Sequence, residues 1–155
     1  MLLPAATAHP VHVSLPDLAA TEAFAGRVAS TLRAGDCLLL DGDLGAGKTT
    51  FARALIQPLL AEPEDIPSPT FTLVQTYETP HFEIWHCDLY RLRGADDLVE
   101  LGLEEAFGTA VTLIEWPDRL GGLTPPHAQH LRFEITGAEA RRLTITGDAR
   151  WEALP

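Results

Sequence analysis

Apolar residues recur along the chain at two different spacings, and the spacing changes from one segment to the next. Alternation at period two in residues 10–15 predicts a half-buried strand, and the helical spacing within residues 17–35 predicts an amphipathic helix after it. Asp17 is expected to cap this helix, and Gly35 is expected to stop it. Residues 36–42 are apolar without alternation, which is typical of a strand covered on both faces.

The remaining segments continue this alternation of strands and helices. A helix should begin near Lys48 and end or kink at Pro58, because proline lacks the amide hydrogen that a helix interior needs. Beyond it the pattern predicts, in order, a hairpin of residues 70–77 and 81–92, a helix over 94–108, a buried strand over 110–116, and a closing hairpin of residues 129–136 and 141–147. This order predicts an α/β protein, which we expect to form one domain over residues 1–155.

One strand-to-helix connection carries a complete chemical motif. Gly42, Gly47, Lys48 and Thr49 match G-x-x-x-x-G-K-[ST] between a predicted buried strand and a predicted helix. The glycines let successive backbone amides point at phosphate oxygens, Lys48 would reach the terminal phosphates, and the Thr49 hydroxyl would bind Mg²⁺. Thr50 either contacts the α-phosphate or is only a tolerated helix residue. The nucleotide ligands expected from this connection are Asp43, Leu44, Gly45, Ala46, Gly47, Lys48, Thr49 and Thr50.

Two carboxylates at strand ends are candidates for the metal and the attacking water. Asp88 shares a strand face with His86 and Tyr90, and these polar side chains need partners if they are buried. A magnesium-bound nucleotide would supply such a partner for the Asp88 carboxylate. Glu115 ends an apolar run at the sheet edge where open α/β proteins keep their ligands. Both acids compete for the Walker B role. We assign Asp88 to the outer shell of the metal and Glu115 to the metal or the water; for either one, a solvent-facing strand end is the alternative.

A third segment, SPTFT, places hydroxyl groups between the P-loop helix and the first hairpin. Switch-type NTPases keep a hydroxyl that senses the γ-phosphate at this position. Thr70 is the better candidate for that catalytic role, whereas Ser68 is equally well explained by a turn in which it caps its own backbone.

Composition narrows the function classes. The chain has 11 basic and 22 acidic residues, a net charge of −11, which disfavours a broad phosphate-tracking surface for DNA or RNA. Cys37 and Cys87 lie within apolar runs and are expected to be small core residues rather than disulfide or metal ligands. The start of the chain does not match a secretory signal, and no apolar run is long enough to span a bilayer. We therefore expect a cytoplasmic protein with no membrane contact.

The segments after the P-loop occur in the order found in one bacterial family. The chain resembles the TsaE (YjeE) family between Gly42 and Leu120 through the segments GDLGAGKTTFARAL, SPTFTLVQTY, HCDLYRL, ELGLEE and LIEWPDRL. The resemblance implies a single P-loop NTPase domain with a central, mostly parallel sheet, antiparallel hairpin insertions and helices on both faces.

The resemblance also implies a function. Members of this family are the ATPase component of the machinery that makes threonylcarbamoyladenosine in tRNA. It implies ATP and Mg²⁺ as ligands, TsaD and TsaB as protein partners, and slow ATP hydrolysis that depends on those partners and resets their complex. Contact with tRNA is expected mainly through the partners, which agrees with the acidic composition.

Individual residues carry over by motif. The P-loop residues match the nucleotide site of the family, Thr70 its switch threonine, and Asp88 and Glu115 its acidic pair. Trp116 matches the tryptophan of the E-W pair of the family.

Two other functions remain open from the sequence. A small-molecule P-loop kinase would fit the chain length, but the arginines after Thr50 do not cluster in a segment that resembles a lid. A nucleotide-binding scaffold without turnover would keep the same loop. Substituting Asp88 or Glu115 would separate this scaffold from an ATPase. The sequence motifs leave the choice between ATP and GTP open, and the lack of a base-reading N-K-x-D motif is a small argument for ATP.

Overall fold

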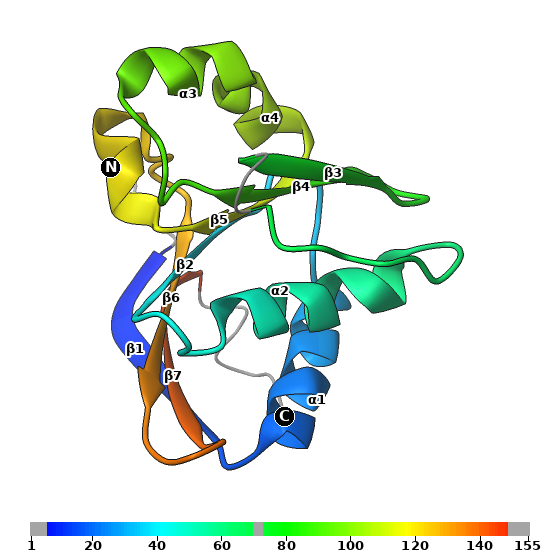
Figure 1. Cartoon of the computed structure of the whole chain (residues 1–155), viewed down its shortest axis with the longest axis vertical. Coiled ribbons are helices and arrows are strands. Elements are labelled where there is room, and N and C mark those ends of the chain that lie inside the picture. The colour runs from blue at the N-terminus through cyan, green and yellow to red at the C-terminus, as the bar shows by residue number, and fades with distance from the viewer. Residues whose placement is uncertain (1–5, 70–72, 149–155) are drawn as a thin grey trace.

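The computed structural model describes residues 6–69 and 73–148, which form a seven-stranded sheet with helices on both sides (Figure 1). The strands are β1 (Ala6–Leu15), β2 (Cys37–Gly42), β3 (Val74–Glu78), β4 (Glu83–Asp88), β5 (Val111–Glu115), β6 (Gln129–Ile135) and β7 (Arg141–Asp148). The α-helices are α1 (Leu18–Ala29), α2 (Lys48–Ile56), α3 (Ala95–Leu101) and α4 (Leu103–Thr109), and two 3₁₀ helices are η1 (Gln57–Leu59) and η2 (Pro117–Leu123).

The sheet is mixed, with strand order β1-β7-β6-β2-β5-β4-β3. Strands β6, β2, β5 and β4 pair in parallel at its centre. The β3–β4 and β6–β7 hairpins add antiparallel pairs, and β1 lies antiparallel to β7 at one edge. The predicted mostly parallel sheet with antiparallel hairpins is therefore confirmed. The carboxyl ends of the central strands meet at one edge, where ligands of open α/β sheets bind.

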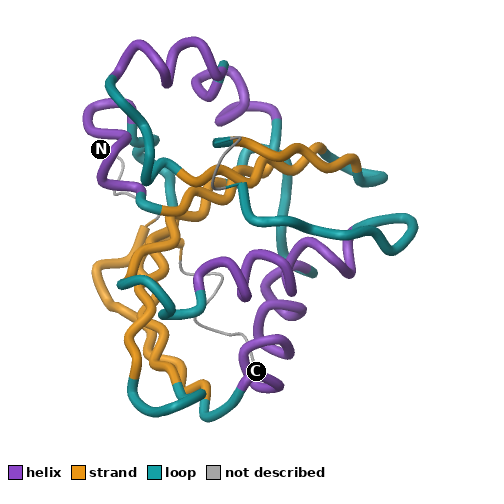
Figure 2. Tube along the Cα trace, viewed as in Figure 1, coloured by secondary structure: helices purple, strands orange, loops and turns teal. Residues whose placement is uncertain are grey.

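Strand residues alternate between two apolar cores, one on each face of the sheet. Leu38 and Leu40 of β2 pack in the core that α1 and α2 cover, whereas Cys37 and Leu39 pack in the core that α3 and α4 cover. Figures 1 and 2 show these two helix pairs on opposite sides of the strands, as predicted. Cys37 and Cys87 are free and buried, and burial raises the pKa of the Cys37 thiol to about 11.

The predicted helix over residues 94–108 is wrong as a single element. Gly102 adopts φ +77°, a left-handed conformation that glycine tolerates and that no α-helix continues through. Its amide donates to the carbonyl of Val99, which closes α3, and α4 begins at the next residue. A glycine in the middle of the predicted helix therefore separates two short helices.

Helix α1 begins as predicted but ends earlier. The Asp17 carboxylate accepts a hydrogen bond from the amide of Ala20 at 2.8 Å, which confirms the cap. The helix ends at Ala29, and Gly35 lies in the following turn with φ +93°, where its amide donates to the carbonyl of Ala110.

Helix α2 ends at Ile56, just before the 3₁₀ turn that contains Pro58, in agreement with the prediction. Among the described residues, no helix is both long and apolar enough to cross a membrane.

Candidate nucleotide-binding site

The connection between β2 and α2 has the backbone shape that the motif requires. Gly42, Gly45 and Gly47 have φ values of +144°, +79° and +105°. At Gly42 a Cβ atom would come 2.6 Å from the carbonyl oxygen of Phe133 on β6, so only glycine fits. Gly47 precedes α2, and no side chain among the described residues caps this helix end. Its first amides are therefore available to a phosphate group.

Lys48 lies at the centre of the site and is 5% exposed. Its Nζ atom donates to the carbonyl oxygen of Gly42 at 2.6 Å and lies 3.6 Å from the ring centroid of Trp116. Burial lowers the pKa of Lys48, while the carboxylates of Glu115 and Asp41 oppose this shift. The ammonium group is thus held beside the P-loop by a carbonyl and an aromatic face, within the motif that directs it to phosphates.

Trp116 reaches this position through an unusual backbone conformation. It follows the last residue of β5 with φ +59°, which is rare for residues other than glycine. Its indole also contacts the ring of Tyr90, with the two centroids 4.9 Å apart.

The predicted strand over residues 81–92 is shorter than expected, because β4 ends at Asp88. Tyr90 lies beyond this end and is half-exposed, so it does not continue the strand face of His86 and Asp88.

Glu115, the last residue of β5, is buried, and both of its carboxylate oxygens have hydrogen-bond partners. It is 2% exposed, so the solvent-facing alternative is wrong for this residue. The Thr49 hydroxyl lies 2.9 and 3.1 Å from its two carboxylate oxygens, and Nε2 of the fully buried His86 lies 2.7 Å from Oε2. The hydroxyl and the carboxylate that are expected to bind Mg²⁺ are therefore already in contact.

Asp88 ends β4 directly beside Glu115, since the two residues are register partners on neighbouring parallel strands. It is 7% exposed, and its Oδ1 atom accepts the amide of Tyr90 at 3.0 Å. Burial raises the pKa of the Asp88 carboxyl, the Tyr90 amide opposes this, and the nearby Glu115 raises it further. Asp88 therefore also lies inside the site rather than in solvent.

This set of oxygen atoms fits a magnesium ion that is shared with phosphates. The donors are the Thr49 hydroxyl and the carboxylates of Glu115 and Asp88, which are hard ligands of the kind that Mg²⁺ prefers. Within residues 6–69 and 73–148 no group of three or more His, Cys, Asp or Glu side chains could hold a metal alone. Magnesium commonly takes one or two carboxylates and completes its shell with phosphate oxygens and water.

These residues surround a pocket of about 270 Å³, which we call the P-loop pocket. Its walls bring together most of the predicted site: Leu44, Gly45, Gly47, Lys48, Thr49, Thr50, Asp88 and Glu115. Ser68 also lines it, whereas the predicted switch residue Thr70 lies outside the described residues. Asp43 and Ala46 are part of the same loop but do not line the pocket, and Ala46 is buried.

Two residues of this site were not predicted as site residues. His86 had a signal, because it shares a strand face with Asp88. Arg141, the first residue of β7, lines the pocket and donates from Nη2 and Nε to the carbonyls of Gly45 and Ala46, both at 3.1 Å. These partners are 96 and 95 residues away in sequence, so no local pattern could indicate the contact.

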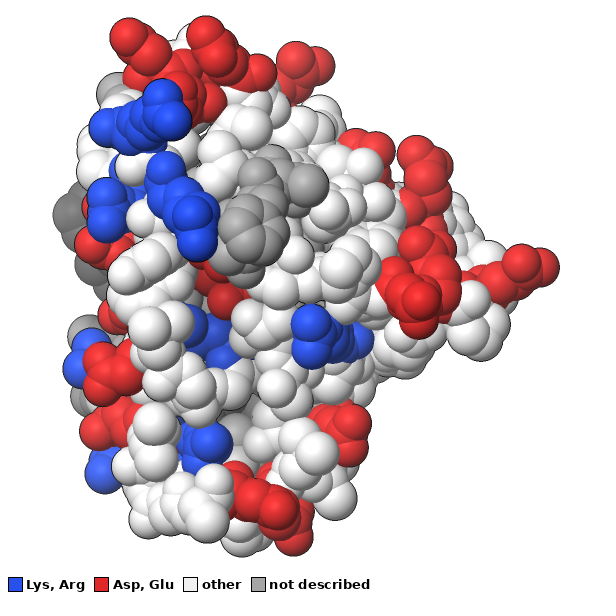
Figure 3. Space-filling model, in the orientation of Figure 1, with Lys and Arg blue, Asp and Glu red and all other residues white. Residues whose placement is uncertain are grey.

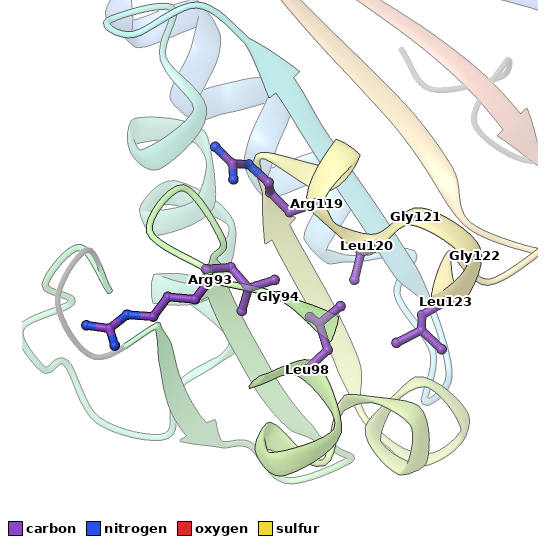
Figure 4. A pocket seen from close by; sticks show the side chains of 9 residues that line it. Arg93, Gly94, Leu98, Arg119, Leu120, Gly121, Gly122 and Leu123 are labelled. Carbon is purple, nitrogen blue, oxygen red and sulfur yellow. The ribbon is translucent and has the colours of Figure 1, made fainter. Parts of the chain in front are cut away.

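A larger pocket of about 320 Å³ lies elsewhere and shares no lining residue with the P-loop pocket. Figure 4 shows Leu98, Leu120 and Leu123 converging on it, with the guanidinium groups of Arg93 and Arg119 directed away. Its lining has no carboxylate that could hold a metal, so it fits a magnesium nucleotide less well than the P-loop pocket does.

The chain is similar to known proteins over most of its length. Residues 15–144 match the family model described as "Threonylcarbamoyl adenosine biosynthesis protein TsaE". The chain belongs to the TsaE family. The TsaE protein of Rickettsia bellii is 44% identical over 128 residues, covering 83% of this chain and 89% of the relative. The TsaE protein of Bacillus subtilis is 35% identical over 136 residues, covering 86% and 84%.

A solved structure has the same fold. The crystal structure of YdiB from Bacillus subtilis superimposes with a TM-score of 0.73 at 28% identity, and covers 93% of this chain and 89% of the other. The family that the sequence resembles and the predicted fold class are both confirmed. This TsaE-family chain accordingly has a role in tRNA threonylcarbamoyladenosine biosynthesis.

Proposed function

We propose that this TsaE-family chain hydrolyses ATP with Mg²⁺ and, as an accessory subunit, resets a complex of TsaB and TsaD between turnovers of tRNA modification. The observation that carries the proposal is the contact between Thr49 and Glu115 beside Lys48, at the start of a P-loop helix. A hydroxyl, a carboxylate and an ammonium group thus converge where the terminal phosphates of a nucleotide would lie.

Each residue has a distinct part in the proposed reaction. The amides of residues 43–49 bind the phosphate oxygens, and Lys48 balances the charge that spreads over the γ-phosphoryl group as the bond to the β-phosphate breaks. Thr49 and Glu115 would hold a magnesium ion, which would neutralise phosphate charge and orient the triphosphate. Asp88, which ends the neighbouring strand beside Glu115, would accept hydrogen bonds from water at this edge of the site. A water oxygen bonds to the γ-phosphorus, and its proton leaves to this carboxylate-lined edge or to solvent.

The kinase alternative has less support. Among the described residues that line the P-loop pocket, the arginine is Arg141, and its guanidinium is bonded to backbone carbonyls of the loop and of the β6–β7 turn. A kinase lid needs arginines that reach the transferred phosphate. The pocket therefore supports transfer to water better than transfer to a small molecule.

Surface charge supports an indirect contact with tRNA. In Figure 3 acidic side chains gather at the top of the view, where Figure 1 places α3 and α4, and on the part of the molecule that projects to the right. The acidic residues Asp96, Asp97, Glu104 and Glu105 lie in the first turns of these helices. At a net charge of −11, a partner protein rather than this chain is expected to hold the RNA backbone.

The test is an ATPase assay of the chain alone and with TsaB, TsaD and tRNA. We expect slow turnover alone, stimulation by the partners, and loss of turnover in the Lys48→Ala variant. Glu115→Gln should retain ATP binding but lose hydrolysis by a factor of about 100 or more, because it removes a charged ligand of the metal. Unchanged turnover in either variant would contradict the proposal, and binding without hydrolysis in the unmodified chain would favour a scaffold.

A further inference from the structure

The side chain of Arg141 is hydrogen-bonded to two separate stretches of backbone at once. It is the half-buried first residue of β7, and its Nε and Nη2 atoms donate to the P-loop carbonyls of Ala46 and Gly45, both at 3.1 Å. Its Nη1 atom donates to the carbonyls of Gly137 and Ala140 in the β6–β7 turn, at 3.1 and 2.8 Å. One guanidinium group therefore joins the P-loop to this turn.

The contact with Ala46 fixes the direction of the next amide of the loop. In a planar trans peptide the carbonyl and the amide hydrogen point in opposite directions, and no peptide bond among the described residues is cis. Because Arg141 holds the Ala46 carbonyl, the amide of Gly47 is directed away from the guanidinium. Among the described residues this amide has no acceptor, and Gly47 lines the P-loop pocket. It is therefore available to a phosphate oxygen.

The preceding peptide group is held at both ends. Arg141 donates to the Gly45 carbonyl, and the amide of Ala46 donates to the carbonyl of Asp43 at 3.0 Å. A glycine-rich loop without such contacts would lose much conformational freedom when it closes on a ligand. A loop whose peptide groups are already oriented loses less, so it binds the same phosphates more tightly.

The β6–β7 turn is a firm attachment point for Arg141. The Ala140 carbonyl accepts both Nη1 of Arg141 and the amide of Thr136, the latter at 3.1 Å, which closes the turn. Strand β6 pairs in parallel with β2, and Gly42 at the start of the loop is the register partner of Phe133. The guanidinium therefore fastens the loop to the same sheet from which the loop emerges.

These contacts leave Arg141 little capacity to bind a phosphate itself. A guanidinium group has five N–H donors. Nε uses its one donor, Nη1 uses two and Nη2 uses one on backbone carbonyls, so a single N–H of Nη2 is left. Reaching the terminal phosphates would require Arg141 to give up its contacts with the loop.

We propose that Arg141 is a positioning residue that orients the P-loop amides for phosphate through the carbonyls of Gly45 and Ala46. This inference rests on the proposed function, because it takes the P-loop to hold ATP or ADP. The residue acts on the loop and not on the reacting phosphoryl group, so it contributes to the affinity for phosphates rather than to the chemical step.

The experiment separates the geometry of the guanidinium from its charge. Arg141→Lys keeps the charge, but an ammonium group is a single point and cannot reach both the loop and the turn. Arg141→Met removes the charge as well. The control is Arg142→Met, because Arg142 is the next residue on β7, is exposed, and has its Nη2 atom 3.3 Å from Nδ1 of His12 on β1.

Binding of MgADP and of magnesium pyrophosphate to the full chain is measured by titration calorimetry, and thermal unfolding checks that each variant is folded. Steady-state ATPase kinetics give kcat and KM. The amide resonance of Gly47, measured by NMR without ligand, reports the orientation of the loop directly.

We expect Arg141→Lys and Arg141→Met each to weaken both ligands by about tenfold, because the loop must then be ordered during binding. The two ligands should lose affinity equally, since they share the phosphates. KM for ATP should rise by a similar factor while kcat changes less than about threefold, because the loop holds the phosphates in the ground state and in the transition state. The Gly47 resonance should shift in both variants, and Arg142→Met should change none of these quantities.

Four results would overturn the assignment while the proposed function stands. Normal binding by folded Arg141→Lys would show that the guanidinium geometry is not needed. Equal losses in Arg142→Met would show that charge alone is responsible. A fall in kcat with unchanged binding would place Arg141 in the chemical step, and a loss of MgADP without a loss of pyrophosphate would place its effect at the nucleoside. If neither ligand binds the unmodified chain, the proposed nucleotide function itself fails, and this assignment fails with it.

Discussion

Replacement of His86 by phenylalanine tests whether this buried side chain positions Glu115. The imidazole is fully buried, with Nε2 at 2.7 Å from the Glu115 carboxylate. Loss of a hydrogen bond to a charged group costs about 1.5–3 kcal/mol. His86→Phe also removes the buried Nδ1 atom, which has no hydrogen-bond partner among the described residues, and this returns about 1 kcal/mol. The free energy of unfolding should therefore fall by about 0.5–2 kcal/mol.

A double-mutant cycle separates this contact from simple repacking. Urea unfolding of His86→Phe, Glu115→Gln and the double variant should give a coupling free energy of about 1–2 kcal/mol, because the two side chains touch. A role in positioning Glu115 also predicts that His86→Phe lowers kcat for ATP hydrolysis more than it raises KM. A coupling free energy below about 0.5 kcal/mol, together with an unchanged kcat, would refute this reasoning.

Three further outcomes are expected. Gly42→Ala should lower the free energy of unfolding by about 3 kcal/mol or more, because φ at this position is +144° and the new Cβ atom would meet the Phe133 carbonyl. Thermal or urea unfolding measures this change, and an unchanged stability would contradict the close approach of Gly42 to Phe133. Burial raises the pKa of Asp88 in the folded state, so the folded chain binds the carboxyl proton more tightly than the unfolded chain does. The stability that this proton contributes is fully present below the usual pKa of 3.8 and is lost as the pH rises through the raised pKa. Asp88→Asn should therefore stabilise the chain at neutral pH, with a gain that shrinks in acid; a gain independent of pH would rule out this cause. Because Trp116 contacts the Lys48 ammonium, MgADP should change tryptophan fluorescence, and Trp116→Phe should abolish that change; a change that persists in the variant would place the reporter elsewhere.

Features that depend on neighbouring residues were predictable from the sequence. The P-loop uses consecutive residues, so its motif contains both the turn and the ligands, and the Asp17 cap follows from residues three positions apart. The face shared by His86 and Asp88 follows from strand periodicity alone. The break at Gly102 did not follow, because a glycine inside a helical pattern can either be tolerated or take a left-handed conformation, and tertiary packing decides.

Features that depend on the order of strands were out of reach. Arg141 reaches the P-loop because β6 pairs with β2 and β7 pairs with β6, which brings the β6–β7 turn beside the end of β2. The spacing of apolar residues predicts neither of these strand pairings. The sequence therefore indicated where phosphates would bind but gave no indication that Arg141 lies beside that loop.

Two features of the candidate nucleotide site are electrostatically unfavourable in the free protein, and this has a consequence for stability. Asp88 and Glu115 end neighbouring strands in register, so two carboxylates share one edge, while burial disfavours the charge of Lys48 beside them. Both effects weaken the folded state. A magnesium ion between the carboxylates, and phosphates beside the ammonium, would reverse each of them, because each ligand brings the opposite charge. Under the proposed function, the same groups that make the free site unfavourable make the binding of a magnesium nucleotide favourable, so the ligand should stabilise the fold well beyond its apolar contacts.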